Sequence, residues 1–315
     1  MLRRFVCVSA AAVVLFGAAA KKPLKIALVT WRGETEAETG FRDQLKELGY
    51  KVDFTVLDAN QSREQLAGLL RQNVKPGTFD YVYTFGTTAS LTTKAFLQRS
   101  TPQIFNIVTA PVEAELVKNI DTPGDNVSGV CNFAPLELQI ENAMKIVTFS
   151  RLGYVYNPKE KNSDIVRASL EALGRKRGFS VVDLRLLPDK VGVDANFAKL
   201  VARKTEFDAV YVGSDSFLGS IAPTIGKQLL DAKIISISGM LQMLENGFLL
   251  GTVPDYRTLG GLAAKIVDRN QKGEELGTIP VQSQDRPPLV VNDKTRALLG
   301  ITIPSNIKPQ VRLMN

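Results

Sequence analysis

The sequence predicts an α/β fold of two successive lobes, each built on a doubly wound parallel sheet. Short apolar runs alternate with segments whose apolar residues recur at helical spacing, which is the pattern of βαβ units. The pattern then restarts, because strand starts expected at residues 26, 52, 81 and 103 recur at 152, 180, 209 and 234, between 126 and 131 residues later. Two lobes of like topology explain this spacing, and chance similarity of two ordinary βαβ runs is the alternative.

The elements of the first half have clear local signals. Ala37, Phe41, Leu45 and Leu48 recur at helical spacing and predict the first helix, which Gly49 ends. The other expected elements are strands at 26–31, 52–57, 81–85 and 103–108 and helices at 63–72 and 88–97.

The second half repeats the alternation after a turn-rich stretch at 122–130. The expected strands are 152–156, 180–187, 209–213 and 234–237, and the expected helices are 165–173, 195–202 and 217–230. Beyond them, a strand at 248–253, a helix at 258–269, an extended segment at 281–291 and a short helix at 292–299 are expected. The adjacent Pro287 and Pro288 indicate an edge or crossing strand.

The charge of the chain gives no indication of a nucleic-acid partner. The 315 residues carry a formal net charge of +7, but Lys and Arg are scattered along the sequence. The densest basic run, at 175–177, falls at the end of an expected helix and is typical of a solvated face. We therefore expect no nucleic acid among the partners.

Residues 1–20 have the layout of a secretory signal peptide. A basic start precedes an apolar stretch at 5–15, and the alanines at 18–20 supply the small residues of a cleavage site. The stretch is too short and too rich in alanine for a stable membrane span. Cys7 lies early in the apolar stretch and not at the cleavage site, which argues against a lipid anchor. We expect a free protein in the periplasm.

The residue inventory argues against an enzyme. The chain contains no histidine, so it has no Ser-His-Asp triad, no Cys-His pair and no histidine metal site. It also lacks a G-x-G-x-x-G motif after a strand and a Walker-type loop. Cys131 is expected to be a buried structural thiol. We expect no catalytic residue, no metal and no cofactor, with a carboxylate hydrolase as an open but unsupported class.

Candidate ligand-binding residues fall at matching strand ends in the two halves. The turn after the first strand, at Trp31, corresponds to Asn157, and the turn at Thr87 corresponds to Asp215. Open α/β sheets bind small ligands at the carboxyl ends of their strands. If the two lobes face one another, these four turns lie on either side of one ligand.

The chemistry of these turns predicts a zwitterionic ligand such as an amino acid. Gly86, Thr87 and Thr88 offer hydroxyls and the free N–H groups of a helix start, which suit a carboxylate. Asp215 suits an ammonium group, and Trp31 offers a flat surface for stacking. Neutral hydrogen bonds are expected from Asn157 and Ser163.

Each of these residues also has a simpler structural interpretation. Thr88 and Ser163 suit helix N-caps, and Asp215 suits the cap of the helix that follows it. Trp31 suits half-buried packing against the core. The coincidence of the candidates at matching topological positions favours the binding interpretation.

Five stretches, taken together, resemble a known family. They are residues 41–50, 86–89, 123–130, 156–158 with 162–163, and 289–304. They resemble the substrate-binding proteins of ABC transporters with the type I periplasmic-binding fold, and among these the tryptophan- and tyrosine-binding members and their mostly uncharacterised relatives. The similarity covers essentially all of the chain after the signal peptide, and it is specific for the family but not for a ligand.

The resemblance implies two lobes joined by a hinge of three crossings, near 130–132, 237–239 and 281–283. The implied division is a signal peptide at 1–20, lobe 1 at 21–131 plus 239–281, and lobe 2 at 132–238 plus 282–315. It also implies that Thr87, Thr88 and Asp215 hold the charged groups of an amino acid.

Two further residues complete the expected ligand-binding set. Tyr156 lies at the end of a strand, and Ser238 lies at a hinge crossing. Arg32 departs from the common family sequence and would suit a second carboxylate. The Asp255-Tyr256 pair matches a family motif at the hinge side of the cleft.

The function expected from the resemblance is extracytoplasmic capture of a small ligand for an ABC importer. The ligand would favour closure of the lobes, and the closed form would dock on a permease in the inner membrane. We expect a monomer. A sensor that presents its closed form to a receptor kinase or chemoreceptor is the alternative, which the sequence does not separate from transport.

Overall fold

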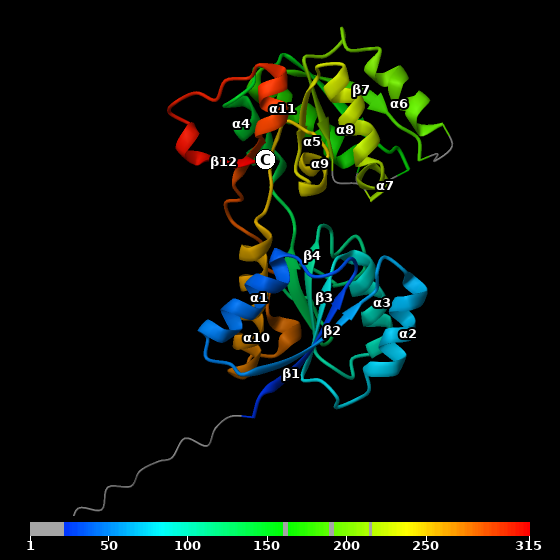
Figure 1. Cartoon of the computed structure of the whole chain (residues 1–315), viewed down its shortest axis with the longest axis vertical. Helices are drawn as coiled ribbons and strands as arrows, with labels where there is room; N and C mark the ends of the chain where they lie inside the picture. The colour runs from blue at the N-terminus through cyan, green and yellow to red at the C-terminus, as the bar shows by residue number, and fades with distance from the viewer. Residues whose placement is uncertain (1–21, 160–162, 189–191, 214–215) are drawn as a thin grey trace, which may run out of the picture.

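The chain folds into two α/β lobes that face one another along the long axis of the molecule (Figure 1). The computed structural model describes residues 22–159, 163–188, 192–213 and 216–315. The expected signal peptide lies outside these residues. No helix in the described part of the chain has the length and apolar character to cross a membrane.

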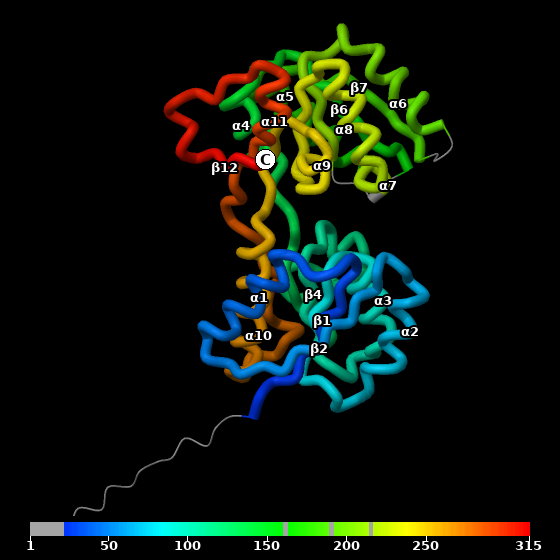
Figure 2. The backbone as a smooth tube through the Cα atoms, viewed as in Figure 1, coloured from blue at the N-terminus to red at the C-terminus, as the bar shows by residue number. Residues whose placement is uncertain are grey.

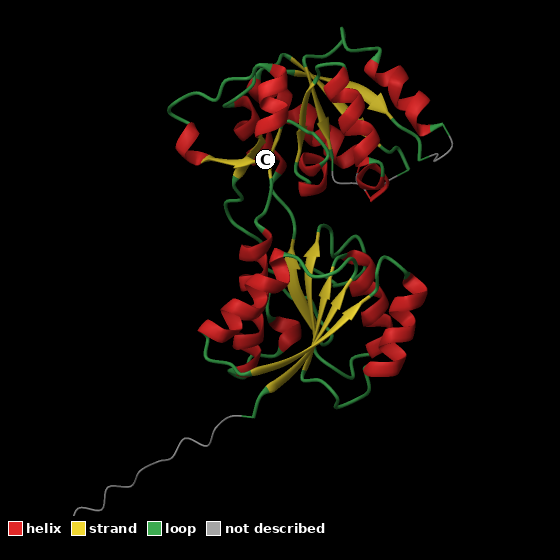
Figure 3. Ribbon diagram, viewed as in Figure 1, coloured by secondary structure: helices red, strands yellow, loops and turns green. Residues whose placement is uncertain are grey.

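Lobe 1 contains a five-stranded parallel sheet in the described residues, with the order β2-β1-β3-β4-β5. Helices α1 and α10 cover one face of this sheet, and α2 and α3 cover the other (Figure 3). The elements are β1 (Leu24–Thr30), α1 (Glu36–Glu47), β2 (Val52–Asp58), α2 (Arg63–Asn73), β3 (Tyr81–Phe85), α3 (Thr87–Leu97), β4 (Gln103–Val108), β5 (Val127–Cys131), α10 (Tyr256–Gln271) and the 3₁₀ turn η1 (Leu276–Thr278).

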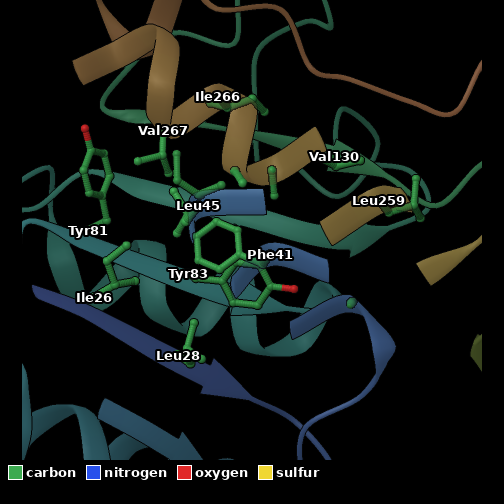
Figure 4. Close-up of a cluster of buried hydrophobic side chains, with 14 of the residues drawn as sticks. Ile26, Leu28, Phe41, Leu45, Tyr81, Tyr83, Val130, Leu259, Ile266 and Val267 are labelled. Carbon is green, nitrogen blue, oxygen red and sulfur yellow. The ribbon is translucent and has the colours of Figure 1, made fainter. Parts of the chain in front are cut away.

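The contact between α1 and α10 explains why a C-terminal helix belongs to the first lobe. A Cβ atom on Gly40 would lie 2.0 Å from the carbonyl oxygen of Arg257, and one on Gly260 would lie 2.0 Å from that of Ala37. The two helices therefore approach backbone to backbone, which only glycine permits at these positions. Figure 4 shows the core beneath them, where Phe41 and Tyr83 lie ring against ring between α1 and the sheet.

Lobe 2 contains a seven-stranded sheet in the described residues, with the order β12-β11-β10-β9-β8-β6-β7. Its pairs are parallel except for β10 with β11, which is antiparallel. The elements are α4 (Leu136–Met144), β6 (Arg151–Tyr156), α5 (Ser163–Arg177), β7 (Ser180–Arg185), α6 (Val193–Val201), β8 (Ala209–Val212), α7 (Ser216–Ser220), α8 (Ala222–Asp231), β9 (Ile235–Ser238), α9 (Leu241–Glu245), β10 (Leu250–Thr252), β11 (Leu289–Asn292), α11 (Asp293–Leu299), η2 (Lys308–Gln310) and β12 (Val311–Met314).

The two sheets confirm the predicted repeat of topology. The order β2-β1-β3-β4-β5 in lobe 1 matches the order β7-β6-β8-β9-β10 in lobe 2, strand for strand along the chain. The fold is therefore the expected pair of doubly wound α/β lobes. Lobe 2 differs by the two added strands β11 and β12, which run opposite to the rest of its sheet.

The predicted lobe boundary at residue 239 is wrong. Strand β10 pairs with β9 and β11 in the sheet of lobe 2, and α9 packs beside it. Residues 239–252 therefore stay in lobe 2, and the chain returns to lobe 1 only at Asp255, the N-cap of α10. The physical reason is the close fit of β10 against β9, where a Cβ atom on Gly251 would lie 1.8 Å from the carbonyl oxygen of Ser238.

One predicted helix is two helices in the structure. The expected helix at 217–230 breaks near Ile221, between α7 and α8. Pro223 lies in the first turn of α8, where its missing N–H has no cost, whereas it would remove a hydrogen bond from a continuous helix.

The chain passes between the lobes after β5, after β10 and before β11, as the backbone tube shows (Figure 2). The first and third crossings pair with each other: Cys131 N donates to Gln282 O at 2.7 Å, and Gln282 N donates to Gly129 O at 2.9 Å. At the second crossing, Asp255 forms an ion pair with Arg312 of β12. The hinge is therefore held by backbone pairing and one ion pair.

Candidate functional site

The candidate site lies at the carboxyl ends of the lobe 1 strands. These ends point toward lobe 2 (Figure 3), and the loops after β1 and β3 lie side by side because β1 pairs with β3. On the other side, α7 and α9 of lobe 2 face lobe 1 (Figure 1). The strand ends predicted from the sequence to carry a ligand are thus on facing sides of the two lobes.

The turn at Gly86 is held in one conformation by buried polar contacts. Gly86 has φ +81° and ψ 163°, which glycine adopts readily, and its N–H donates to Asn106 O at 2.9 Å. Ser90 Oγ donates to Gly86 O at 2.7 Å and lies 2.9 Å from Thr84 Oγ1. Gln103 Nε2 donates to Thr84 Oγ1 and to the carbonyl oxygen of Ser90. The start of α3 is therefore rigid before any ligand arrives.

Thr87 and Thr88 begin α3 at this turn. Thr87 is exposed and Thr88 is half-buried. No side chain caps the first turn of α3, and neither hydroxyl bonds another described residue. The N–H groups in the first turn of this 11-residue helix therefore have no capping side chain among the described residues. They lie, together with the two threonine hydroxyls, at the carboxyl end of the sheet. Such groups favour an anion, in agreement with the chemistry predicted for this turn.

Trp31 follows β1 and serves in part as packing. Its side chain is half-buried and contacts the clusters on both faces of the lobe 1 sheet. Its carbonyl oxygen accepts a hydrogen bond from Gln61 N at 2.7 Å. The packing interpretation therefore holds for one part of the indole, and the exposed part stays a candidate stacking surface.

The predicted residues after β6 bond mainly to one another. Asn157 and Ser163 are both buried, and Ser163 Oγ donates to the carbonyl oxygen of Asn157 at 2.8 Å. Asn157 Oδ1 accepts from Lys159 N at 3.0 Å. The amide nitrogen of Asn157 has no partner among the described residues. The amide N–H groups of Asn157 are therefore unused among the described residues, whereas the hydroxyl of Ser163 is used in the turn.

Tyr156 and Ser238 are held inside lobe 2. The ring of Tyr156 stacks on Tyr154 with centroids 4.8 Å apart, and its hydroxyl accepts from Arg185 Nε at 2.9 Å. Burial of the phenol raises its pKa. Ser238 Oγ donates to Val212 O at 2.9 Å. These contacts give both residues a structural role, and their contact with a ligand stays a prediction.

Asp215, the predicted partner of an ammonium group, lies outside the described residues. The same holds for Asn162, which belongs to one of the family-like motifs. The described elements on either side of it are β8, which ends at Val212, and α7, which begins at Ser216.

A cation and two aromatic rings at the hinge side of this edge form a feature that the sequence showed only in part. Arg32 Cζ lies 5.8 Å from the ring centroid of Phe85, and Tyr256 meets Phe85 edge to face at 6.0 Å. The sequence marks Arg32 as a departure from the family pattern and Tyr256 as part of a family motif. No sequence signal, however, places α10 beside β3.

A buried carboxyl lies below this group. Glu38 of α1 accepts hydrogen bonds from Thr35 N at 2.7 Å and from Tyr83 Oη at 2.9 Å. Tyr83 in turn accepts from Asn106 Nδ2 at 3.0 Å. Burial raises the pKa of Glu38 and holds the pKa of Tyr83 well above its usual range. The network ties α1, β3 and β4 together directly under the candidate site.

Asp255 and Cys131 have structural roles in the hinge. Asp255 caps α10 by accepting from Thr258 N at 2.9 Å, and it pairs with Arg312. Cys131 is buried, and burial raises the pKa of its thiol to about 12. The thiol is therefore not a ready nucleophile. Among the described residues, no group of three or more acidic or thiol side chains is arranged to hold a metal ion.

Comparison with known proteins assigns the chain to a family. Residues 26–311 match the family model described as ABC transporter substrate binding protein. The chain is also 28% identical over 275 residues to a tyrosine-binding protein of Clostridioides difficile (strain R20291), a match that covers 84% of this chain and 77% of the relative.

Solved structures share the two-lobed fold. A ligand-free, open substrate-binding protein with adhesive properties from Clostridium difficile has a TM-score of 0.76 at 24% identity, covering 93% of this chain and 99% of the other. An ABC domain in complex with L-Trp from Streptococcus pneumonia has a TM-score of 0.72 at 25% identity, with the same coverage.

The chain belongs to the family of ABC transporter substrate-binding proteins, as its resemblance predicted. Members of this family bind a substrate and are not enzymes. The fold is that of the type I periplasmic-binding proteins.

Proposed function

We propose that this protein captures a small zwitterionic amino acid, in particular an aromatic one, between its two lobes and delivers it to an ABC permease. The observation that carries the proposal is the rigid Gly86 turn, with open N–H groups and two threonine hydroxyls where lobe 1 faces lobe 2. These groups suit the carboxylate of the ligand.

The rest of the ligand is assigned by the chemistry around this turn. The exposed part of Trp31 offers a stacking surface, and Asn157 offers an amide donor from lobe 2. Asp215 takes the ammonium group. The tyrosine and L-Trp named for two relatives support an aromatic amino acid. A ligand that contacts both lobes favours their closed arrangement by its differential affinity, and the closed form docks on the permease.

The proposed location is the periplasm, with residues 1–20 removed as a signal peptide. The protein acts as a monomer that shuttles between free ligand and the permease. If transport is its role, ligand-loaded protein and not ligand-free protein should stimulate ATP hydrolysis by the reconstituted permease and its ATPase.

The first test is a thermal-shift and calorimetric screen of the amino acids, after native mass spectrometry of the purified protein for retained ligand. A ligand at a hundred times its Kd should stabilise the folded state by about 2.7 kcal/mol. Tyrosine and tryptophan are expected to raise the melting temperature most. The absence of a shift with every amino acid would refute amino-acid capture and leave the family and the fold untouched.

The second test addresses Asp215. Asp215→Asn should weaken amino-acid binding by about 2 kcal/mol, roughly 30-fold, because a charge-assisted bond to the ammonium group is lost. Asp194→Asn, at an exposed position in the first turn of α6, makes the same change of charge on lobe 2 and should leave affinity unchanged. Equal affinities of the Asp215 variant and the unmodified chain would remove Asp215 from the site.

A further inference from the structure

Arg32 lies where a ligand held by the Gly86 turn would meet lobe 1 on the hinge side. Its guanidinium carbon is 5.8 Å from the ring centroid of Phe85, within the range of a cation–π contact, and the ring of Tyr256 packs edge to face on Phe85. The side chain itself is exposed. We call Arg32, Phe85 and Tyr256 the cation–aromatic platform. The two rings orient the guanidinium but leave most of its five N–H donors unused.

The neighbouring arginines of lobe 1 pair with carboxylates, whereas Arg32 has no such partner among the described residues. Arg42 pairs with Glu34, and Arg257 pairs with Glu36 and Asp43. Across the described ranges, no carboxylate lies within ion-pair distance of Arg32. An arginine with no counter-ion among the described residues, at the edge where the ligand is expected, is suited to an anion supplied by the ligand.

Other charges near the platform do not take that place. Glu38 lies in the core below, where Thr35 and Tyr83 occupy its oxygens. Glu34 is engaged by Arg42. Glu245, at the end of α9 in lobe 2, is exposed, and we treat it as the competing partner for Arg32 when the lobes close.

The platform and the Gly86 turn lie on different sides of the sheet edge. Phe85 belongs to the cluster that packs under α1 and α10. Ala89, in the first turns of α3, belongs to the cluster on the opposite face, under α2 and α3. Because the two anion-favouring features lie next to clusters on opposite faces of the sheet, we assign each of them its own acid group.

We propose that Arg32 is the counter-ion of a second carboxylate, so that the preferred ligand is an amino acid carrying an additional acid group. The proposal rests on amino-acid capture and adds to it the charge of the side chain. Planar bidentate pairing of guanidinium with carboxylate supplies the specificity, and the rings of Phe85 and Tyr256 hold the guanidinium in place for it.

The experiment compares isosteric ligands that differ only in charge, by isothermal titration calorimetry on the full mature chain. The pairs are 4-carboxy-L-phenylalanine with 4-carbamoyl-L-phenylalanine, and L-glutamate with L-glutamine. The acid of at least one pair is expected to bind about tenfold or more tightly than its amide, the scale of a hydrogen-bonded charge pair. Arg32→Gln should reduce that ratio to near one.

The control is Arg71→Gln, which removes an exposed arginine from the last turn of α2 and should keep the acid preference intact. Arg32→Lys keeps the charge without the planar fork and should retain only part of the preference.

Four outcomes overturn the proposal. If amino acids bind but the acids have no advantage, or if the advantage survives in Arg32→Gln, Arg32 is not a counter-ion for the ligand, and amino-acid capture still stands. If Arg32→Gln and Glu245→Gln weaken acid and amide ligands equally, Arg32 pairs with Glu245 across the lobes instead. If no amino acid binds at all, amino-acid capture falls, and the proposal falls with it.

Discussion

Gly86 shows how a single residue prepares the candidate site. Its backbone, at φ +81° and ψ 163°, turns the chain from β3 into α3 so that the first N–H groups of the helix face outward. No atom lies within 4 Å of the place where a Cβ would stand, so the requirement for glycine comes from the backbone alone. This glycine was identified from the sequence because a Gly-Thr-Thr turn follows an apolar run.

At this residue, Gly86→Ala is expected to lower the free energy of unfolding by about 1–3 kcal/mol, because the backbone conformation is one that essentially only glycine adopts. Urea denaturation measures the change. Gly68→Ala is the matched control: Gly68 lies inside α2, also with open space at its Cβ, and alanine there should stabilise by about 0.5–1 kcal/mol. Equal effects at the two positions would contradict the backbone argument.

At the scale of elements, α1 is attached to the sheet by a polar network as well as by its apolar face. Thr35 and Glu38 form a capping box at the start of the helix. The same Glu38 carboxyl accepts a hydrogen bond from the hydroxyl of Tyr83 in β3, so this bond links the start of the helix to the strand. The capping pattern is visible in the sequence, but the partner in β3 is not, since it depends on how α1 lies on the sheet.

The buried Glu38 gives a prediction for pH. Burial raises the pKa of the Glu38 carboxyl in the folded state above its ordinary value. Its contribution to stability is therefore full below the unfolded pKa and is lost as the pH rises through the folded pKa. Glu38→Gln cannot titrate, so its free energy of unfolding should fall less than that of the unmodified chain between about pH 4 and pH 7. Urea melts across this range measure the difference.

The control for Glu38 is Glu64→Gln, at an exposed position in the first turn of α2. Its pH profile should run parallel to that of the unmodified chain. A Glu38→Gln profile that also ran parallel would show that the buried carboxyl does not contribute to the pH dependence.

At the scale of the whole molecule, two lobes of the same topology are joined by three crossings of the chain. The first and third crossings form backbone hydrogen bonds with each other around Cys131 and Gln282. Arg312 and Asp255 add an ion pair between β12 of lobe 2 and the start of α10 in lobe 1. Hinges of this kind permit the closure that capture of a ligand requires.

The interlobe ion pair is expected to contribute little to stability. Arg312 is largely exposed, so Arg312→Gln should change the free energy of unfolding by less than about 1 kcal/mol. Asp255→Ala removes the N-cap of α10 as well and should cost about 1–2 kcal/mol. Urea denaturation of both variants separates the two roles, and a larger cost for Arg312→Gln than for Asp255→Ala would contradict this assignment.

Local sequence patterns are sufficient to predict where most strands begin and which polar residues occupy the turns of lobe 1. Strands β2, β3, β4, β7 and β8 begin at the predicted residues, because apolar runs bounded by turn residues have few alternatives. The Gly86 turn and the double lobe follow from such signals and from the spacing of the strands.

The tertiary structure alone decided which distant segments share a lobe. Strand β10 joins lobe 2 and α10 joins lobe 1, although a few residues separate them, and β11 reverses direction. Short strands and amphipathic helices bury their apolar residues equally well on either sheet, so only packing over the whole chain makes the choice. The same packing brings Tyr256 to Phe85 and Arg32, and thereby creates the platform that no local pattern in the sequence contains.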